Sequence, residues 1–524
     1  MLKLKEKINN LFTKELPADL IQSNATRQVI EAAFSYVNPV KPKNPSLIHV
    51  SNEVAKNLGI SLEETKSEEF LNVFTGNTVL ENSKPYAMAY AGHQFGNWAG
   101  QLGDGRAITL FEAIYNNKST MFQLKGAGKT PYSRRGDGLA VLRSSIREHL
   151  CSEAMYNLGV PTTRSLALFT SGDMVLRDVL YNGNEDYEKG AIVCRTAPSF
   201  IRFGNFELFA SREDLKNLQL LADFTIKHYY PEIKTEGKDK YLEFFETVAD
   251  KTREMIVHWQ RVGFVHGVMN TDNMSIHGIT IDYGPYGWLE DYNPNWTPNT
   301  TDNEHKRYRF GNQPQIAQWN LLQLANALFP LIEEVKPLEK ILNAFPIKYE
   351  EDYIQMMYNK LGLQNSNQET KNSIYLLTEN LQLIQTDMTI FFRNLSQVSK
   401  EDSVENAFEK IKDAFYTLEE AKNSVYDTWM YWFTMYINQL QKENQLDLER
   451  KTAMDLVNPK YVLRNYMAQL AIDDADKEDY NLLNELYEML LNPYEEQEQY
   501  QKWFAKRPDW AKNKVGCSAL SCSS

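Results

Sequence analysis

A chain of 524 residues is long enough for about two to four domains of ordinary size, and its 43% hydrophobic and 24% charged residues are typical of a soluble globular protein. Its formal net charge of −13 disfavours nucleic acid or an anionic membrane as the main partner. Because four cysteines are too few for a disulfide framework and the N-terminal residues lack the apolar stretch of a secretory signal, we expect a cytoplasmic protein, and a monomer.

The first part of the chain is predicted to contain most of the strands. Residues 1–80 are expected to form an N-terminal extension of helices and loops. In the β-rich part that follows, 81–205, the strand-like runs 106–114 and 119–125 flank Asn116-Asn117. This arrangement predicts a β-hairpin.

A helix and further strands are predicted in the rest of the β-rich part. Apolar residues recur at helical spacing over 139–158, and Gly159 followed by Pro161 ends that pattern. The further strands are predicted at 165–170, 174–179 and 191–196.

The pattern becomes helical after residue 205. Within 206–310, an amphipathic helix over 241–262 leads into a polar loop, and 311–524 is helical up to a flexible, cysteine-containing tail. A β-rich part with one helix, then a loop, then helices is the order of the two lobes of a protein kinase. We therefore predict an α+β, protein-kinase-like two-lobed fold, with its N-lobe at 81–205, its C-lobe at 206–310 and additional helices after it.

The stretch HGVMNTDNMSIHGITIDYGP, residues 266–285, is similar to the catalytic loop and metal-binding segment of a protein kinase. Kinases have H-R-D-x-x-x-x-N there, and this chain has His266 and, at the same distance, Asn273. The position of the kinase base holds Val268, which cannot accept a proton, and Asp282 stands where D-F-G has its aspartate. The metal ligands of a kinase are thus present, and its base is absent.

Asn273 and Asp282 offer oxygen ligands, which suit a hard divalent cation such as Mg²⁺ or Mn²⁺. With Val268 at the usual position, Asp272 is the nearest carboxylate that could take a proton. Its alternative roles are a cap of the loop or a partner in the outer shell of the metal.

Lys125 ends the second strand of the predicted hairpin, and Glu148 lies on the helix that follows. Kinases use such a lysine to hold phosphate oxygens and such a glutamate to fix the lysine. Alternatively, the two are surface residues that never meet. Asn273 and Asp282 follow downstream in the kinase order, which favours the pair.

Three glycine-rich stretches flank the predicted hairpin and helix, and glycine allows a backbone to approach phosphate closely. They are Gly103-Asp104-Gly105-Arg106, Gly126-Ala127-Gly128-Lys129-Thr130 and Gly136-Asp137-Gly138. The second is no Walker A loop, because Gln123 stands where that motif needs glycine. Turns account for most isolated G-x-G patterns, so these stretches alone are weak evidence.

Four arginines lie near these loops, and guanidinium groups match phosphate oxygens. We expect Arg134 and Arg135 to form surface ion pairs. Arg195 and Arg202 lie among apolar residues, so they are expected to be half-buried and to need an anionic partner.

Long motifs in this chain resemble those of the selenoprotein O family. The resemblance is dense over about 80–320 and extends to the C-terminus. The motifs are YAGHQFGNW (90–98), QLGDGRA (101–107), KGAGKTPYSRRGDG (125–138), RTAPSFIRFG (195–204) and the stretch 266–285.

The resemblance implies a kinase-like fold in which ATP binds in a flipped orientation and AMP, not phosphate, is transferred to hydroxyl groups of proteins. Bacterial members are also described as transferring UMP. The resemblance implies that Asp272 is the proton acceptor and that Glu148 orients Lys125, with metal held by Asn273 and Asp282. The residues that it assigns to nucleotide are Gly103, Gly105, Arg106, Lys125, Asp137, Gly138, Arg195, Arg202 and Asp282.

The cysteines depart from the family pattern. Cys522 stands where some members have selenocysteine, third from the end. Some bacterial members pair this position with a cysteine in the loop after D-Y-G-P, where this chain has 297–299, Thr-Pro-Asn. A regulatory disulfide between Cys517 and Cys522 is the local alternative.

Two other functions remain open from the residues alone. A small-molecule kinase of the aminoglycoside or choline type would also place an aspartate where Val268 stands, which counts against it. A nucleotide-binding scaffold without catalysis would have no need of Asn273 and Asp282.

Overall fold

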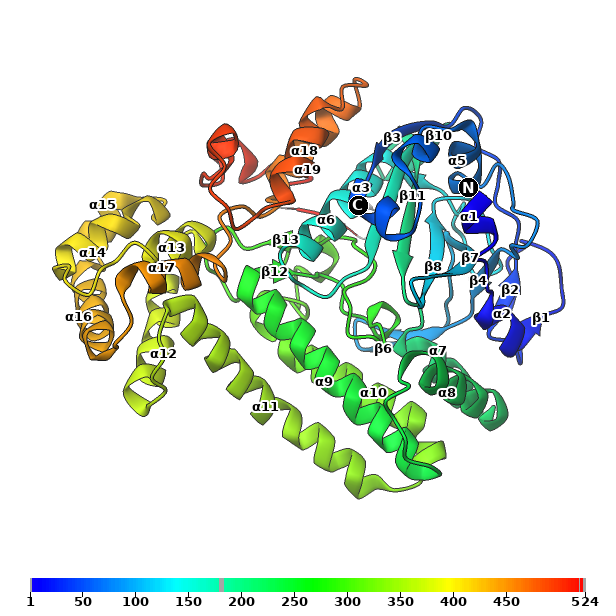
Figure 1. Cartoon of the computed structure of the whole chain (residues 1–524), viewed down its shortest axis with the longest axis horizontal. Helices are drawn as coiled ribbons and strands as arrows, with labels where there is room; N and C mark the ends of the chain where they lie inside the picture. The colour runs from blue at the N-terminus through cyan, green and yellow to red at the C-terminus, as the bar shows by residue number, and fades with distance from the viewer. Residues whose placement is uncertain (1, 179–182, 518, 522–524) are drawn as a thin grey trace.

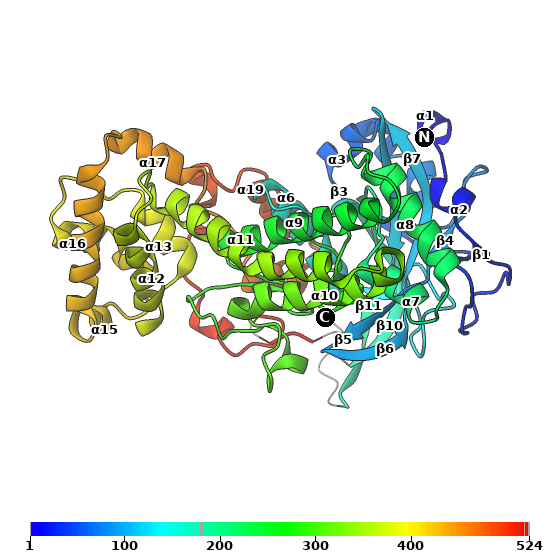
Figure 2. The same cartoon turned by 90° about the horizontal axis from the view of Figure 1, so that it is seen from below.

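A computed structural model describes residues 2–178, 183–517 and 519–521, and shows an α+β protein. The strands of the main sheet gather at one end of the molecule, and helices α12–α17 form the other end (Figure 1). The long helices α9, α10 and α11 run side by side between these ends, as Figure 2 also shows.

Among the described residues, the main sheet has nine strands in the order β1-β2-β4-β7-β8-β11-β10-β3, with β9 paired to β11. Its pairs are antiparallel except β1 with β2. These strands are β1 (Ala18–Asp19), β2 (Phe34–Tyr36), β3 (Ser46–Val50), β4 (Tyr86–Met88), β7 (Ala107–Tyr115), β8 (Lys118–Lys125), β9 (Ala140–Val141), β10 (Arg164–Asp178) and β11 (Glu185–Ala197). Two short antiparallel pairs are β5 (Ala91–Gln94) with β6 (Asn97–Gln101) and β12 (Phe264–Val265) with β13 (Gly287–Trp288).

The predicted hairpin is confirmed as β7 and β8. Asn116 and Asn117 both have positive φ, 50° and 59°, as a two-residue hairpin turn requires. The strands predicted at 165–170 and 174–179 are one strand, β10, whose register shifts between Thr170 and Met174. Residues 179–182 lie outside the described part of the chain.

The first 80 residues contribute β1, β2 and β3 to the main sheet, where the sequence pattern predicts helices and loops. These strands are two, three and five residues long, so they carry too little alternation of apolar and polar residues to be recognised.

After residue 205 the described chain is mainly helical, as the sequence pattern predicts. In chain order the helices are α1 (Leu2–Lys5), α2 (Leu11–Glu15), α3 (Asn52–Asn57), α4 (Leu62–Thr65), α5 (Glu68–Phe74), α6 (Leu142–Asn157), α7 (Phe203–Ala210), α8 (Leu215–Tyr229), α9 (Lys238–Val262), α10 (Gln313–Ile332), α11 (Val335–Leu361), α12 (Gln368–Leu383), α13 (Met388–Leu395), α14 (Val404–Ile411), α15 (Leu418–Asn423), α16 (Tyr426–Lys442), α17 (Asp447–Asp455), α18 (Asn465–Ala475) and α19 (Asn481–Leu490). Short 3₁₀ turns are η1 (Thr271–Asn273), η2 (Thr300–Asp302), η3 (Phe310–Asn312), η4 (Lys412–Ala414), η5 (Glu498–Trp503) and η6 (Asp509–Ala511). None of the helices in the described ranges is long and apolar enough to cross a bilayer.

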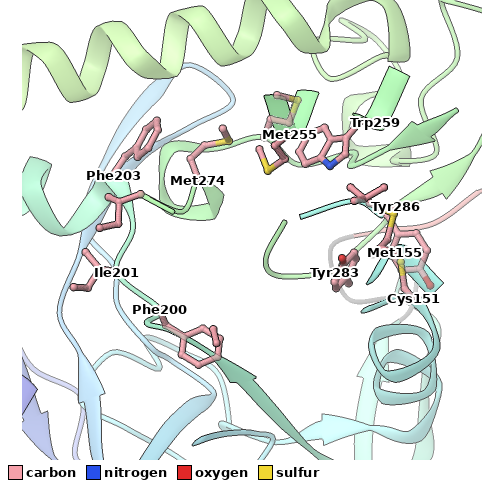
Figure 3. Close-up of a cluster of buried hydrophobic side chains, with 14 of the residues drawn as sticks. Cys151, Met155, Phe200, Ile201, Phe203, Met255, Trp259, Met274, Tyr283 and Tyr286 are labelled. Atoms are coloured by element: carbon pink, nitrogen blue, oxygen red, sulfur yellow. The ribbon is translucent and has the colours of Figure 1, made fainter. Parts of the chain in front are cut away.

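Helix α6, predicted over 139–158, packs on β10 and β11 and also contacts α18 and α19. Figure 3 shows Cys151 and Met155 of α6 gathered with Tyr283 and Tyr286 in one apolar cluster. The segment after Asp282 therefore shares its core with α6, which fixes the two relative to one another.

The helices α11–α17 enclose a second core, rich in aromatic residues. At its centre on α16, Trp432 is fully buried, and its indole N–H donates to Ser373 O at 3.0 Å. Its ring stacks on Tyr436 at 5.0 Å.

We predict that Trp432→Ala lowers the free energy of unfolding by about 3–5 kcal/mol, because it leaves a large cavity in this core. Urea unfolding followed by tryptophan fluorescence and circular dichroism measures the change. Tyr431→Ala is the matched control, since Tyr431 is the adjacent residue on α16 and 61% exposed, and it should change stability by less than about 0.5 kcal/mol. Equal effects of the two substitutions would contradict the orientation of α16.

Candidate active site

A cleft of about 1170 Å³ opens between the main sheet and the loop that follows β12. The cleft brings together the residues that the sequence predicts to contact nucleotide or metal. Those that line it are Gly103, Gly105, Arg106, Lys125, Asp137, Gly138, Arg195, Arg202, Asp272, Asn273 and Asp282. Glu148 lies just beneath its wall, 2% exposed.

Lys125 and Glu148 meet in the floor of the cleft. The Lys125 ammonium donates to Glu148 Oε2 at 2.5 Å, and both side chains are buried. Burial by itself raises the pKa of Glu148, but the charges of Lys125 and Arg195 outweigh it and hold that pKa below its usual value. Glu148 is therefore an anion that holds the lysine in place at the end of β8.

Arg195 joins the sheet, α6 and the segment after β12. Its Nη1 donates to Glu148 Oε1 at 3.0 Å and to Asp282 Oδ1 at 2.6 Å. Its Nε and Nη2 both donate to Gln123 Oε1, at 2.9 and 2.6 Å, across the β8–β11 pairing. Arg195 is therefore a buried cation with a partner on each of three elements.

Asp282 lies between two arginines. Besides Arg195 on Oδ1, Arg202 Nη1 donates to its Oδ2. Burial by itself raises the pKa of Asp282, but Arg202, Arg195 and Lys125 together hold that pKa well below its usual value. Asp282 is also held at φ 57°, a left-handed conformation that aspartate tolerates better than most residues.

Two buried polar residues in this network were missed by the sequence reasoning. Gln123, noted only because it breaks a Walker A pattern, donates to Asp104 Oδ2 at 3.2 Å while it accepts from Arg195. Asp104 also accepts from Met88 N at 3.0 Å and lies 3.6 Å from Arg202. The position of Asp104 inside a glycine-rich motif was the only available signal, because buried polar partners leave no periodic pattern.

The glycines of the cleft are required by close backbone approaches. A Cβ on Gly138, whose φ is 76°, would lie 2.2 Å from Gly128 O. A Cβ on Gly103 would lie 2.4 Å from the Tyr132 ring. Larger residues at these positions would therefore displace the loops that line the cleft.

The remaining basic residues lie at the mouth. Asp137 is bound by Arg177 through both oxygens, at 2.7 and 2.8 Å. Arg134 and Arg135 are exposed and line the cleft. Their positive charges would attract a negatively charged ligand to this part of the cleft.

The turn η1 presents Asp272 to the cleft. Burial raises the pKa of Asp272 to about 6, although Gln94 and Arg202 act in the opposite direction. Its Oδ1 has no hydrogen-bond partner. A carboxyl group with this pKa can both accept and release a proton near neutral pH.

His266 supports the loop around this turn. Its Nε2 donates to Ile281 O at 2.9 Å, and its Nδ1 accepts from Val268 N at 3.3 Å. His266 therefore ties the loop to the residue that precedes Asp282, as a structural histidine.

Asn273 and Asp282 fit a site for a hard divalent cation. Asn273 Nδ2 donates to Val268 O at 2.9 Å, so the amide oxygen is the atom of this side chain that could bind a cation. No group of three or more His, Cys, Asp or Glu side chains within the described ranges could hold a metal by itself. Two oxygen donors completed by phosphate oxygens and water are the arrangement in which proteins usually bind Mg²⁺.

The C-terminal segment lies beside the loop of η1. Leu520 N donates to Pro298 O at 3.0 Å, Leu520 O accepts from Thr300 N at 2.7 Å, and Asn299 Nδ2 donates to Gly267 O at 3.0 Å. Cys517 is buried and forms no disulfide within the described residues, and burial raises the pKa of its thiol to about 11. Cys522 lies outside the described residues, so its pairing with Cys517 stays a prediction.

Comparisons with known proteins agree with the motifs. A family model described as "Protein adenylyltransferase SelO" matches residues 19–491. Proteins named "Protein nucleotidyltransferase YdiU" are similar over almost the whole chain. That of Flavobacterium johnsoniae is 67% identical, covering 99% of both chains; that of Rhodopirellula baltica is 51% identical, covering 98% of this chain and 99% of its own. Because both the model and these relatives span most of the sequence, the chain belongs to the protein adenylyltransferase SelO family.

Proposed function

We propose that this protein transfers a nucleoside monophosphate, AMP from ATP or UMP from UTP, to hydroxyl groups of Ser, Thr or Tyr in target proteins. We further propose that its fold is kinase-like, with an N-lobe at 81–205, a C-lobe at 206–310, and the helices of 311–524 added to it. The names of the relatives, protein nucleotidyltransferases, support the reaction class.

Two features of the cleft together support the proposal: its floor carries several cations, and the carboxyl group that would act as base lies at Asp272 and not at the position of the kinase base. Lys125, Arg195 and Arg202 converge on the floor beside Asp282, as in an enzyme that binds a triphosphate. The position of the kinase base is Val268, and the carboxyl group that faces the cleft is Asp272. A base at this place suits attack at a different phosphorus atom of the nucleotide.

In the proposed reaction, the triphosphate lies reversed relative to a kinase, with its α-phosphorus toward Asp272. Asp272 accepts the proton of the attacking hydroxyl as the new bond from oxygen to the α-phosphorus forms. The bond from the α-phosphorus to the bridging oxygen breaks, and pyrophosphate leaves with the electron pair. Lys125 and the arginines stabilise the charge that develops on this leaving group.

Mg²⁺ or Mn²⁺, held by Asn273 and Asp282, would neutralise phosphate charge at the reacting centre. The chain's own contribution is to hold the ligand oxygens in place. The contact from Asn273 to Val268 O fixes the amide, and Arg195 and Arg202 fix the carboxylate.

Labelled nucleotides test the reaction directly. The protein is incubated with casein as a hydroxyl-bearing acceptor and with ATP or UTP labelled at the α- or the γ-phosphate. We expect α-label on protein, and pyrophosphate as the other product. Transfer of γ-label would indicate a kinase, and transfer of neither label would indicate a nucleotide-binding scaffold.

We predict that Lys125→Ala lowers kcat/KM for α-label transfer at least roughly 30-fold, which corresponds to about 2 kcal/mol of transition-state stabilisation. The reason is that the substitution removes a fixed positive charge from beside the leaving pyrophosphate. Lys129→Ala is the matched control, since Lys129 lies in the next loop and is exposed. A rate within threefold of wild type for Lys125→Ala would place Lys125 outside the reaction.

We also predict that Asp282→Asn abolishes metal-dependent transfer, because the amide cannot supply the charge that holds both the cation and the two arginines. The rate is measured after treatment with a chelator and again over a titration with Mg²⁺ or Mn²⁺. Wild-type activity should be lost and then restored, whereas the variant should stay inactive at every metal concentration. Full recovery of the variant would remove Asp282 from the metal site.

A further inference from the structure

The hairpin of β5 and β6 is seated against the turn that carries Asp272. Its two-residue turn, Phe95-Gly96, has positive φ at both positions, 50° and 84°, which gives a tight hairpin. Figure 2 shows the hairpin beside α7, and both α7 and η1 contact β5. The hairpin therefore connects α7 to η1.

Consecutive residues of the hairpin bind consecutive residues of the loop. His93 N donates to Thr271 Oγ1 at 2.7 Å, and Phe95 N donates to Asn270 Oδ1 at 3.1 Å. Between these two backbone contacts, Gln94 Nε2 donates to Asp272 Oδ2 at 3.1 Å. Across the described ranges, Gln94 is the only side chain of another residue that donates a hydrogen bond to this carboxylate.

The close packing of β5 against η1 leaves the Asp272 side chain little room to move. A Cβ on Gly92 would lie 3.0 Å from both Asp272 Cβ and Asp272 Oδ1, so β5 packs directly against the carboxylate. At the first residue of β5, a Cβ on Gly204 of α7 would lie 2.1 Å from Ala91 O. Arg202, the residue before α7, also donates to Asp272 O at 2.7 Å. The backbone of the turn and the side chain of Asp272 are thus held by one rigid support.

We propose that Gln94 is a positioning residue that holds the Asp272 carboxylate in the orientation needed to accept the proton of the attacking hydroxyl. The proposal rests on the proposed function, because it gives Asp272 the role of base. Gln94 itself touches neither the proton nor the phosphorus atom. It acts by fixing one carboxylate oxygen, and with it the side-chain rotamer, as the partners of a catalytic group commonly do.

Asp272 needs such a partner because a carboxylate without a hydrogen bond can rotate. Asp272 has two rotatable side-chain bonds, and its Oδ1 has no partner. Without Gln94, the carboxylate could turn toward the guanidinium of Arg202, and the hydroxyl would then meet it in the wrong geometry. The loss would fall on the chemical step, because the groups that hold the phosphates, Lys125 and the arginines, are untouched.

Gln94→Met tests the proposal, because methionine has a similar length and volume but cannot donate a hydrogen bond. Asn97→Ala is the control, since Asn97 is the exposed cross-strand partner of Gln94 in the same hairpin. The readouts are kcat and KM for transfer of α-label from ATP or UTP to casein, and the Kd of the nucleotide by calorimetry.

We expect Gln94→Met to lower kcat about tenfold, the scale of one hydrogen bond to a charged group, with the nucleotide Kd and KM within about twofold of wild type. Asn97→Ala should leave all three unchanged. A second measurement introduces Gln94→Met into Asp272→Asn, assayed at high enzyme concentration over long times. In that background Gln94→Met should lower kcat no further, because the effects of substitutions at residues that act as a unit are not additive.

Two results would overturn the proposal while leaving the proposed function intact. They are an unchanged kcat in Gln94→Met, with or without a weaker nucleotide Kd, and the same fold-loss in the Asp272→Asn background as in wild type. Failure of the wild-type protein to transfer α-label would overturn the proposed function instead, and with it the base that Gln94 would position.

Discussion

The need to pair buried charges governs the centre of this molecule. Lys125, Glu148, Arg195 and Arg202 are buried at the floor of one cleft, and the side chain of Asp282 beside them is only 19% exposed. An isolated charge in such a place would cost several kcal/mol, so each must meet an opposite charge with good geometry. Here cations and anions alternate from Lys125 through Glu148 and Arg195 to Asp282 and Arg202. Removing any one of them would leave at least one neighbour with one charged partner fewer.

The elements around the cleft are arranged so that this pairing is possible. Helix α6 carries Glu148 and is tied to the segment after Asp282 by a reciprocal contact: Arg147 Nη2 donates to Tyr286 O, and Tyr286 OH donates to Arg147 O, both at 2.8 Å. The apolar cluster of Figure 3 packs beneath the same contact. Movement of α6 would therefore break the core and the charge pairs together.

The turn η1, which carries the proposed base Asp272, is supported from the other side of the cleft. Gln94 and the backbone of the β5–β6 hairpin hold η1, while Arg202 links the same turn to Asp282. The groups that would bind phosphate and the group that would take the proton are thus supported by different elements, which meet at Arg202.

The sequence by itself determined the α+β class, the β7–β8 hairpin, helices α6 and α9 and the helical second half, because each has a long periodic pattern or a turn with a strong preference. The motif spacing also brought Lys125, Asn273 and Asp282 into one predicted site. Only the tertiary structure decided that β1–β3 join the main sheet, because very short strands have no pattern and their pairing is non-local. It alone also decided that Gln123 and Asp104 complete the buried charge network and that Gln94 reaches Asp272. These contacts join residues as many as 178 positions apart, and no local pattern in the sequence records which polar side chain will meet another across a folded core.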